Sequence, residues 1–173
     1  LSILFGSGDG SFYKTDTLTI TQQRAAGVVI GYLDNDNHLD LAVTTQNNSR
    51  LLILSGNGDG TFANPVEYIT SGNPYGLQLG DYDNDLDLDI AVTNGGGNSF
   101  YVHYNDGMGD FSNKVLQPAP NGPPTFLVKG FINNDNFLDL ASAKGGKTTN
   151  TLDILINDQS GNFSTDTAVT TGK

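Results

Sequence analysis

The residues best suited to chemistry are aspartates, and they gather in one short segment. Between Gly80 and Val92, an aspartate occupies every second position from residue 81 to residue 89. In an extended strand these five carboxylates would share one face and repel one another. A bent loop that directs them at a hard cation removes the repulsion, because Ca²⁺ takes six to eight oxygen ligands. The segment therefore predicts a calcium-binding loop, and the alternative is a solvated acidic turn.

The same pattern returns in residues 31–43 and 130–141. The aspartates that close the three segments, Asp40, Asp89 and Asp139, are 49 and 50 residues apart. A second, glycine-rich motif ends in a phenylalanine and keeps nearly the same spacing. Two unrelated motifs with one period indicate a structural repeat of the solenoid or propeller kind. The phenylalanines of the second motif are Phe12, Phe62, Phe111 and Phe163, which are 50, 49 and 52 residues apart.

Composition narrows the class of protein. The 173 residues include 22 glycines and no cysteine, and the net charge is −11. The negative charge argues against nucleic acid, whose phosphates need a basic surface, and the lack of cysteine excludes disulfides and thiolate sites. No stretch reaches the about 20 apolar residues of a membrane span, so membrane insertion is not expected. The chain begins within a repeat, which suggests a part of something longer.

Strand and turn signals divide each period into four strands. The first period has expected strands at residues 24–31, 39–45, 50–55 and 61–69, with the acidic loop after the first strand. A four-stranded antiparallel meander of about 50 residues has the size of a propeller blade. We therefore expect an all-β partial propeller of about three and a half blades, with a solenoid of sheets as the alternative. The expected segments are 1–23, the last two strands of a preceding blade, and the blades 24–70, 71–121 and 122–173.

Together these motifs resemble the FG-GAP/VCBS repeat family, whose repeats are integrin-α-like propeller blades. The resemblance rests on the acidic loop, the Asp-Leu-Ala-Val strand of residues 40–43 and the Gly-Asp-Gly-Thr-Phe turn of residues 58–62. It covers essentially the whole chain. The resemblance implies a propeller fold with Ca²⁺ in a nine-residue loop between the first two strands of each blade. Side chains at loop positions 1, 3, 5 and 9 and the carbonyl at position 7 would be the ligands.

The second loop matches this ligand pattern fully. Its one departure is Leu86 at position 6, where the family has glycine; a left-handed conformation there costs a branched residue about 1–2 kcal/mol. The ligands that the resemblance implies are Asp81, Asp83, Asp85, Asp89 and the carbonyl of Asp87.

The other two loops match in part. Tyr32 and Phe131 replace the aspartate at position 1, and Asn133 is neutral at position 3. Because calcium affinity follows ligand charge, we expect occupancy in the order second, first, third. The remaining implied ligands are Asp34, Asp36, Asp40 and the His38 carbonyl in the first loop, and Asn133, Asp135, Asp139 and the Phe137 carbonyl in the third.

Other calcium motifs fit poorly. An EF-hand needs flanking helices and a glutamate at position 12 of its loop, whereas both flanks here are β-type and the chain has a single Glu67. The nonapeptide β-roll fails because the period is about 50 residues and not nine. Mg²⁺ is less suited than Ca²⁺ because it keeps most of its waters.

In a meander, the acidic loops and the glycine turns lie on one face of the blades, so variable connections form the other. Variable loops on a rigid scaffold commonly carry binding. We expect a noncatalytic, calcium-stabilised module for extracellular protein–protein or cell-surface adhesion, with a protein or glycan ligand on the opposite face and possible self-association. The opposite-face segments are 46–49, 70–74, 95–98, 118–124 and 144–150.

Two alternatives stay open. One is a glycan-binding, lectin-like propeller, for which Tyr75, Tyr101 and Tyr104 could offer stacking platforms, although such aromatics more often belong to a core. The other is an accessory domain of a secreted enzyme. We do not expect an enzyme, because an acid–base pair or activated nucleophile is needed, and the only histidines are His38 and His103.

Overall fold

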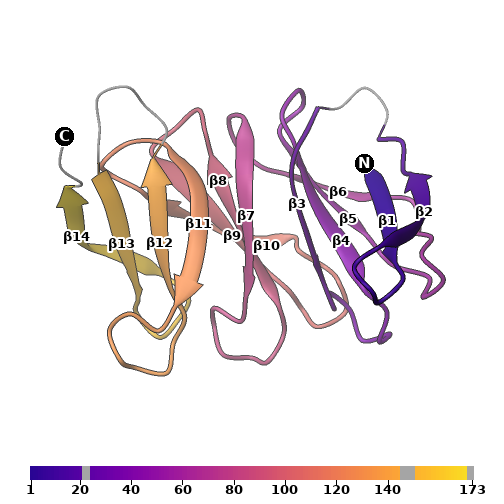
Figure 1. Ribbon diagram of the computed structural model, residues 1–173. Helices are drawn as coiled ribbons and strands as arrows, with labels where there is room; N and C mark the ends of the chain where they lie inside the picture. Colours follow the sequence, from indigo (N-terminus) through magenta and orange to yellow (C-terminus); the bar gives the residue numbers. More distant parts are fainter. Residues whose placement is uncertain (21–23, 145–150, 171–173) are drawn as a thin grey trace.

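The computed structural model describes residues 1–20, 24–144 and 151–170. All regular structure in these ranges is β-strand, and every strand pair is antiparallel (Figure 1). None of the described residues forms a helix of the length and apolarity that a membrane span requires.

The strands form one hairpin and three full sheets. The N-terminal hairpin pairs β1 (Ser2–Gly6) with β2 (Phe12–Thr17). The first sheet contains β3 (Ala25–Gly31), β4 (Asp40–Thr45), β5 (Arg50–Leu54) and β6 (Val66–Ile69). The second contains β7 (Pro74–Gly80), β8 (Asp89–Asn94), β9 (Ser99–Tyr104) and β10 (Asn113–Pro118). The third contains β11 (Pro124–Gly130), β12 (Asp139–Lys144), β13 (Thr151–Asn157) and β14 (Phe163–Thr170).

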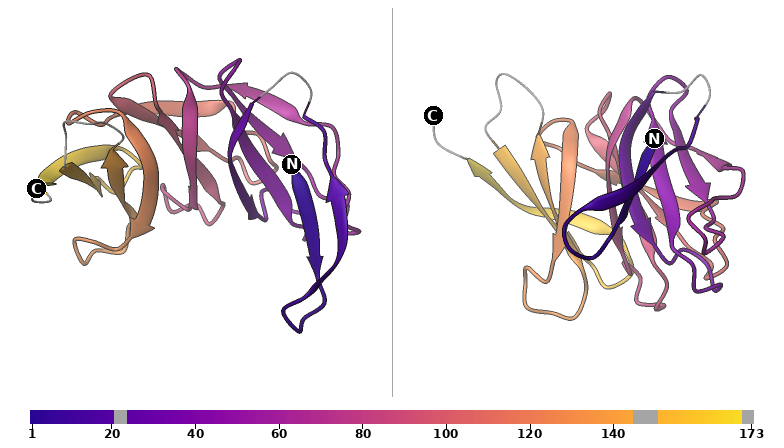
Figure 2. Two further views of the ribbon diagram at one scale, coloured as in Figure 1. Left: turned by 45° about the horizontal axis from the view of Figure 1, so that its top comes forward. Right: turned by 45° about the vertical axis from the view of Figure 1, so that its right-hand side comes forward.

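Each full sheet is a meander in which strands adjacent in sequence are paired. The sheets follow one another along an open arc, with β3, β7 and β11 on its concave side (Figure 2). This confirms the prediction of an all-β chain of four-stranded propeller-type blades. The predicted blade boundaries at residues 70/71 and 121/122 fall within the connections between sheets. The division of the chain into blades at these residues stays a prediction.

Strand lengths differ from the sequence expectation at the outer strand. The first sheet's outer strand was expected from Thr61, but β6 begins only at Val66. A single bridge between Gly56 and Phe62 precedes an irregular stretch that contains Pro65. Proline has no N–H to donate to a ladder, so pairing resumes only after it. The second strands begin at the closing aspartates themselves.

The cores lie between neighbouring sheets. Side chains alternate across a strand, so Leu41 and Val43 pack toward the N-terminal hairpin whereas Ala42 packs toward the second sheet. All six residues of β4 and all six of β8 are consequently buried. A third cluster, which includes Tyr82, Phe100 and Leu140, lies between the second and third sheets.

Inner strands approach one another so closely that a glycine is required. A Cβ on Gly27 of β3 would lie 2.3 Å from the carbonyl oxygen of Tyr75 in β7. The Thr44 hydroxyl completes this contact: it accepts the Gly27 N–H at 3.0 Å and donates to the Tyr75 carbonyl at 3.0 Å. One side chain thus joins the first sheet to the second.

The contact recurs one period later. A Cβ on Gly76 would lie 2.6 Å from the carbonyl oxygen of Thr125 in β11. The Thr93 hydroxyl accepts the Gly76 N–H at 2.8 Å and lies 3.3 Å from the Thr125 carbonyl, to which it donates. This close approach explains the small residues Gly27 and Gly76 on the inner strands.

The third sheet lacks both parts of the contact. Counted back from Gly130, which pairs with Asp139, Phe126 holds the place of the glycines, and its partner Ala143 holds that of the threonines. Phe126 is 64% exposed. The outward face of β11 therefore cannot take another inner strand at the spacing seen between β3 and β7.

We predict that Gly76→Ala destabilises the chain by about 2 kcal/mol or more, because the added methyl group must displace backbone and not a flexible side chain. The midpoint of urea unfolding measures the loss. Gly130→Ala is the matched control, since a Cβ there would meet nothing within 4 Å among the described residues. Equal midpoints for the two variants would contradict the proposed crowding.

Candidate metal centre

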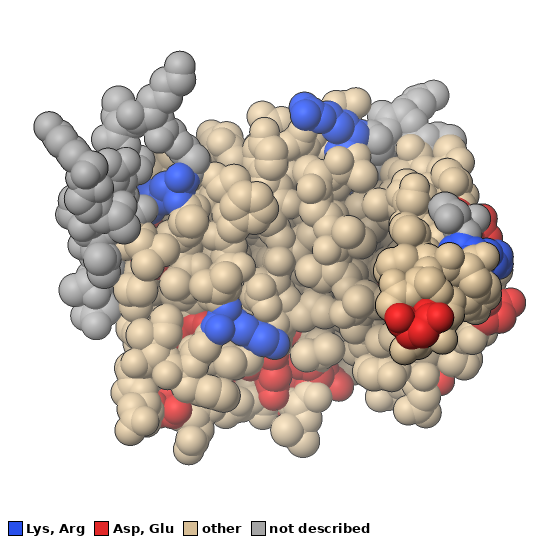
Figure 3. Space-filling view, viewed as in Figure 1, with Lys and Arg blue, Asp and Glu red and all other residues tan. Residues whose placement is uncertain are grey.

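Three acidic loops, residues 32–40, 81–89 and 131–139, connect the first and second strands of the full sheets. They lie at one edge of the arc, the lower edge in Figure 1, and acidic side chains gather there in Figure 3. The glycine turns share this edge: a Cβ on Gly58 would lie 2.6 Å from His38 Nε2, and one on Gly107 would lie 2.5 Å from Asp87 Oδ2. The first and second acidic loops therefore pack against the glycine turns of their own sheets.

The closing aspartate of each loop is fully buried and accepts backbone N–H groups from both sides. Asp40 accepts from Leu33 N at 2.7 Å through Oδ2 and from Gly56 N at 2.8 Å through Oδ1. Leu33 belongs to the start of the acidic loop, and Gly56 follows β5. The carboxylate therefore ties the loop to the far end of the third strand.

The two later repeats reproduce this bond pattern. Asp89 accepts from Tyr82 N at 2.8 Å and Asn105 N at 3.0 Å. Asp139 accepts from Ile132 N at 2.8 Å and Asn157 N at 3.0 Å. Asp139 Oδ2 also accepts the Asn133 N–H at 3.2 Å. In Asp40 and Asp89, each carboxylate oxygen keeps a second lone pair for a cation. The residues predicted as position 9 ligands thus have a structural role: each joins its acidic loop to the end of the third strand by hydrogen bonds. We call such an aspartate a bracket.

Position 5 of each loop makes a local turn. The Oδ1 atoms of Asp36, Asp85 and Asp135 accept the N–H of the residue two positions on, at 2.8, 2.9 and 2.8 Å. These turns fix the backbone at His38, Asp87 and Phe137, the residues whose carbonyls the resemblance implies as ligands.

Position 3 distinguishes the second loop. In the first loop Asp34 Oδ1 accepts the Asp36 N–H at 3.0 Å. In the second, Asp81 takes over that role and accepts from Asp85 N and Leu86 N, both at 3.1 Å. This leaves Asp83 Oδ1 buried with no hydrogen-bond partner. A buried carboxylate oxygen without a partner is costly unless a cation occupies the site.

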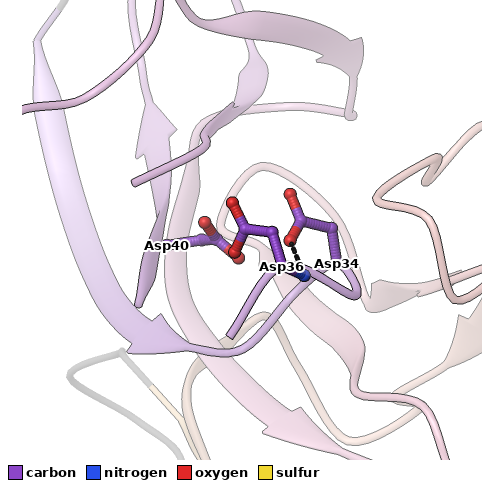
Figure 4. A group of neighbouring side chains, drawn as sticks. All are labelled: Asp34, Asp36 and Asp40. Atoms are coloured by element: carbon purple, nitrogen blue, oxygen red, sulfur yellow. Dashed lines mark hydrogen bonds between the residues drawn. The ribbon is translucent and has the colours of Figure 1, made fainter. Parts of the chain in front are cut away.

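Two groups of carboxylates converge. In each of them, ligand atoms lie within 4.8 Å of one another, which suits a single cation. Figure 4 shows the first group, in which the three side chains turn toward a common space. The side chain of Asp85 does not belong to the second group, although the sequence placed it among the ligands. The expected ligand from Asp87 is its backbone carbonyl, which stays a prediction. The groups are Asp34, Asp36 and Asp40, and Asp81, Asp83 and Asp89.

The third loop contains no such group among the described residues. Asn133 closes the loop on itself: its Oδ1 accepts the Asp135 N–H at 3.0 Å, and its Nδ2 donates to Asp135 Oδ2 at 2.8 Å. An amide at position 3 thus satisfies the carboxylate at position 5 without a cation. The predicted order of occupancy agrees with this geometry and stays a prediction.

The turn positions also differ among the loops. Leu86 has a φ of +81° and is 91% exposed, as the missing glycine at position 6 led us to expect. Asn37 holds the same position with a φ of +62°. In the third loop the positive φ falls at position 4, on Asn134, at +65°. Asparagine tolerates this region readily, whereas leucine stores strain there.

Burial and like charge shift the protonation of the two groups. Burial raises the pKa of Asp89 to about 7, and the negative charges of Asp83 and Asp85 also raise it. The hydrogen bonds from the Asn105 and Tyr82 N–H groups lower the pKa but do not offset burial. Burial, followed by the charge of Asp85, also raises the pKa of Asp83. The pKa of Asp34 is raised, chiefly by burial. In the first group, Asp36 Oδ2 lies 3.2 Å from His38 Nδ1. No described Lys, Arg or His forms an ion pair with Asp81, Asp83 or Asp89, so the second group favours either protons or a cation.

Two buried asparagines escaped the sequence analysis. Asn105 Nδ2 donates to the Leu33 carbonyl of the preceding loop at 3.0 Å, and Asn157 Nδ2 donates to the Tyr82 carbonyl at 2.8 Å. Each thereby ties one sheet to the acidic loop of the sheet before. The signal was present in the sequence, because both stand six residues before the phenylalanine of the glycine turn.

The other candidate side chains belong mainly to the core. Tyr104 is buried and donates to the Gly161 carbonyl at 2.6 Å, whereas Tyr75 is 40% exposed. His103 is fully buried, and its Nδ1 lies 3.0 Å from the Phe111 carbonyl. Burial lowers the pKa of His103 to about 4.

We predict that Asp139→Ala destabilises the chain in the absence of any metal, by about 2–4 kcal/mol, because the backbone N–H groups of Ile132, Asn133 and Asn157 lose their acceptor. Urea unfolding in the presence of a chelator measures this loss. Asp135→Ala is the control and should cost much less, since its carboxylate serves an exposed turn. A metal-free Asp139→Ala protein as stable as the wild type would show that this aspartate serves only as a ligand.

We predict a pH dependence from His103. Its pKa falls from 6.5 to about 4 on folding, so the unfolded chain binds the proton more readily. Stability from this group is complete above pH 6.5 and is lost, up to about 3 kcal/mol, as the pH falls toward 4. His103→Asn keeps an N–H donor but does not titrate, so its unfolding free energy should change less over this range. Parallel pH profiles would refute the assignment.

Comparison with known families supports the repeat. The model of the FG-GAP-like repeat matches residues 32–92, which extend from the first acidic loop to β8. A comparison with curated proteins found no match. The matched segment contains both carboxylate groups and the hydrogen bond from Thr44 to the Tyr75 carbonyl that joins the first and second sheets. Residues 32–92 are therefore similar to an FG-GAP-like repeat, and they lie within a chain of propeller-type blades.

Proposed function

We propose that the chain is a noncatalytic, calcium-stabilised binding module of propeller type. The observation that carries the proposal is the group of Asp81, Asp83 and Asp89, which brings three carboxylates within 4.8 Å and leaves Asp83 Oδ1 buried without a partner. Calcium would supply the positive charge that these oxygens lack. The large and flexible oxygen coordination of Ca²⁺ suits a loop that mixes side-chain and backbone oxygens.

Calcium in this position would be structural. Asp89 already ties the loop to the end of β9, and Asp81 orders the loop backbone at Asp85 and Leu86. A cation held by the same carboxylates would remove their mutual repulsion and hold the strained turn at Leu86 in place. Binding to the folded chain alone would then raise its stability by mass action.

The opposite edge of the blades is the proposed surface for a protein partner. The connections there differ from repeat to repeat, whereas the acidic loops recur. Exposed positions in them include Asn47, Ser71, Gly72 and Asn121. Part of the segment predicted at 144–150 lies outside the described residues. A glycan ligand is favoured less, because Tyr104 is committed to the core.

An extracellular location completes the proposal. Extracellular calcium is abundant enough to fill sites of modest affinity, and the net charge of −11 does not favour nucleic acid. Adhesion at a cell surface is the corresponding role.

We predict that metal-free protein binds calcium, and that Asp83→Asn weakens the tighter site by tenfold or more, roughly the effect of losing one charged ligand. Isothermal titration calorimetry measures both affinities. Because burial raises the pKa of Asp89 to about 7, protons compete with calcium, so affinity should rise from pH 5 to pH 8.

Asp135→Asn is the matched control, since it alters the third loop, in which no three carboxylates converge. It should leave the tighter site unchanged. Equal calcium uptake by wild type and Asp83→Asn would remove the second loop as the site.

A further inference from the structure

The first two acidic loops are joined through one buried residue of the second sheet, Asn105. Its backbone N–H donates to Asp89 Oδ1 at 3.0 Å, and its Nδ2 donates to the Leu33 carbonyl at 3.0 Å. The N–H of Leu33 in turn donates to Asp40 Oδ2 at 2.7 Å. Asp40 and Asp89 are the fully buried members of the two carboxylate groups. A continuous series of hydrogen bonds thus connects one group to the other.

The side-chain oxygen of Asn105 supports the first loop at a second point. Asn105 Oδ1 accepts the Gly109 N–H at 3.1 Å and so holds the glycine turn of the second sheet. Gly109 lies against the first loop, because a Cβ built on it would stand 3.5 Å from Asp34 Cβ. Asp34 belongs to the first carboxylate group. Asn105 therefore supports two members of that group, Asp34 and Asp40, although it comes from the next sheet.

The Asn105 amide is buried and its hydrogen bonds fix its orientation. Asn105 is 6% exposed, and Leu33 is 1% exposed. Asn105 Nδ2 also donates to the Leu88 carbonyl at 3.3 Å, and Oδ1 also accepts the Gly107 N–H at 3.2 Å. An amide with its donors and its acceptor engaged has one favourable orientation. A displacement of Asp89 is therefore passed on to Leu33 and is not absorbed by rotation of the amide.

We propose that Asn105 couples the two carboxylate groups, so that calcium uptake by the second loop raises the calcium affinity of the first. The coupling rests on the proposed function, in which the second loop holds calcium. Its physical basis is shared order: a ligand that fixes Asp89 also fixes Asn105, and the first loop then loses less conformational freedom on taking up its own cation. By linkage, occupancy of the first loop strengthens the second by the same factor.

Charge alone would act in the opposite direction. A cation in the second loop repels a cation in the first through space, which lowers the affinity of the first loop. Removing the Asn105 side chain leaves this repulsion in place. The sign of the coupling, and its loss with the amide, therefore separate the hydrogen-bonded link from electrostatics.

The third sheet provides a matched link that does not reach another carboxylate group. Asn157 donates from its N–H to Asp139 Oδ1 at 3.0 Å and from Nδ2 to the Tyr82 carbonyl at 2.8 Å. The Tyr82 N–H donates to Asp89 Oδ2 at 2.8 Å. This link begins at the second group and ends in the third loop, where no three described carboxylates converge. Asn157 is therefore the control for the structural effect of losing such an amide.

The first sheet indicates how to remove the amide with little damage. Gly56 stands at the place of Asn105, six residues before the phenylalanine of the glycine turn, and its N–H donates to Asp40 Oδ1 at 2.8 Å. Asn105→Gly keeps the corresponding N–H for Asp89 and deletes the side chain alone. Asn157→Gly makes the same change in the third sheet.

The test is a calcium titration of the full chain followed by NMR, in which the Asp36 amide signal reports the first loop. The double variant Asp81→Asn/Asp83→Asn removes two charges from the second group. It should weaken calcium binding by the first loop about fivefold or more. This comparison with the wild type needs no change at Asn105, so it tests the coupling even if Asn105→Gly does not fold.

Two backgrounds decide whether the amide carries the effect. When Asn105→Gly is present, the double variant should leave the affinity of the first loop unchanged. When Asn157→Gly is present, the effect should persist in full. A metal-free measurement is independent of these: in chelator, hydrogen exchange at the Leu33 N–H should be about fivefold faster or more in Asn105→Gly than in the wild type. Exchange at the Ile132 N–H should be equal in the two proteins.

The possible failures are distinguishable. An unchanged or higher first-loop affinity in the double variant overturns the coupling, whereas calcium uptake by the second loop of the wild type still supports the proposed function. Coupling that survives Asn105→Gly overturns the role of Asn105. A wild-type second loop that takes up no calcium overturns the proposed function and the coupling with it.

Discussion

The structure depends on a buried carboxylate that accepts a backbone N–H on each oxygen. Asp40, Asp89 and Asp139 each join the start of an acidic loop to the end of a third strand. Loops at a sheet edge leave backbone donors unpaired, and an unpaired buried donor costs about 1–3 kcal/mol. One aspartate per repeat satisfies two such donors. It thereby holds the loop in the shape that brings the other carboxylates together.

This constraint explains why the three loops share a framework yet differ in how their carboxylates are grouped. The bracket and the turn at position 5 are present in all three. What varies is the side chain at positions 1 and 3. Asp81 frees Asp83 from its local hydrogen bond, whereas Asn133 satisfies Asp135 directly. A repeat can therefore keep its fold without a converging group of carboxylates.

The contacts between sheets follow a second shared rule. Glycine and threonine permit close approach of inner strands at two contacts, and asparagine amides tie each later sheet to the loop of the sheet before. The third sheet departs from the first rule through Phe126 and Ala143. Its outward face thus differs from those of the sheets before it, and the two ends of the arc present different surfaces.

The sequence by itself determined the repeat, the all-β class, the order of four strands and the acidic loops, because spacing and alternation are local properties of the chain. The resemblance to the repeat family, which has glycine at that position, also led us to expect a left-handed turn at Leu86. Tertiary structure alone decided that Asp89 is a bracket, that Asp85 lies outside the carboxylate group and that Asn105 spans two sheets. Each of these depends on which backbone groups other strands bring to the loop. Carboxylate spacing along the chain cannot reveal them, because hydrogen-bond partners come from residues up to 75 positions away.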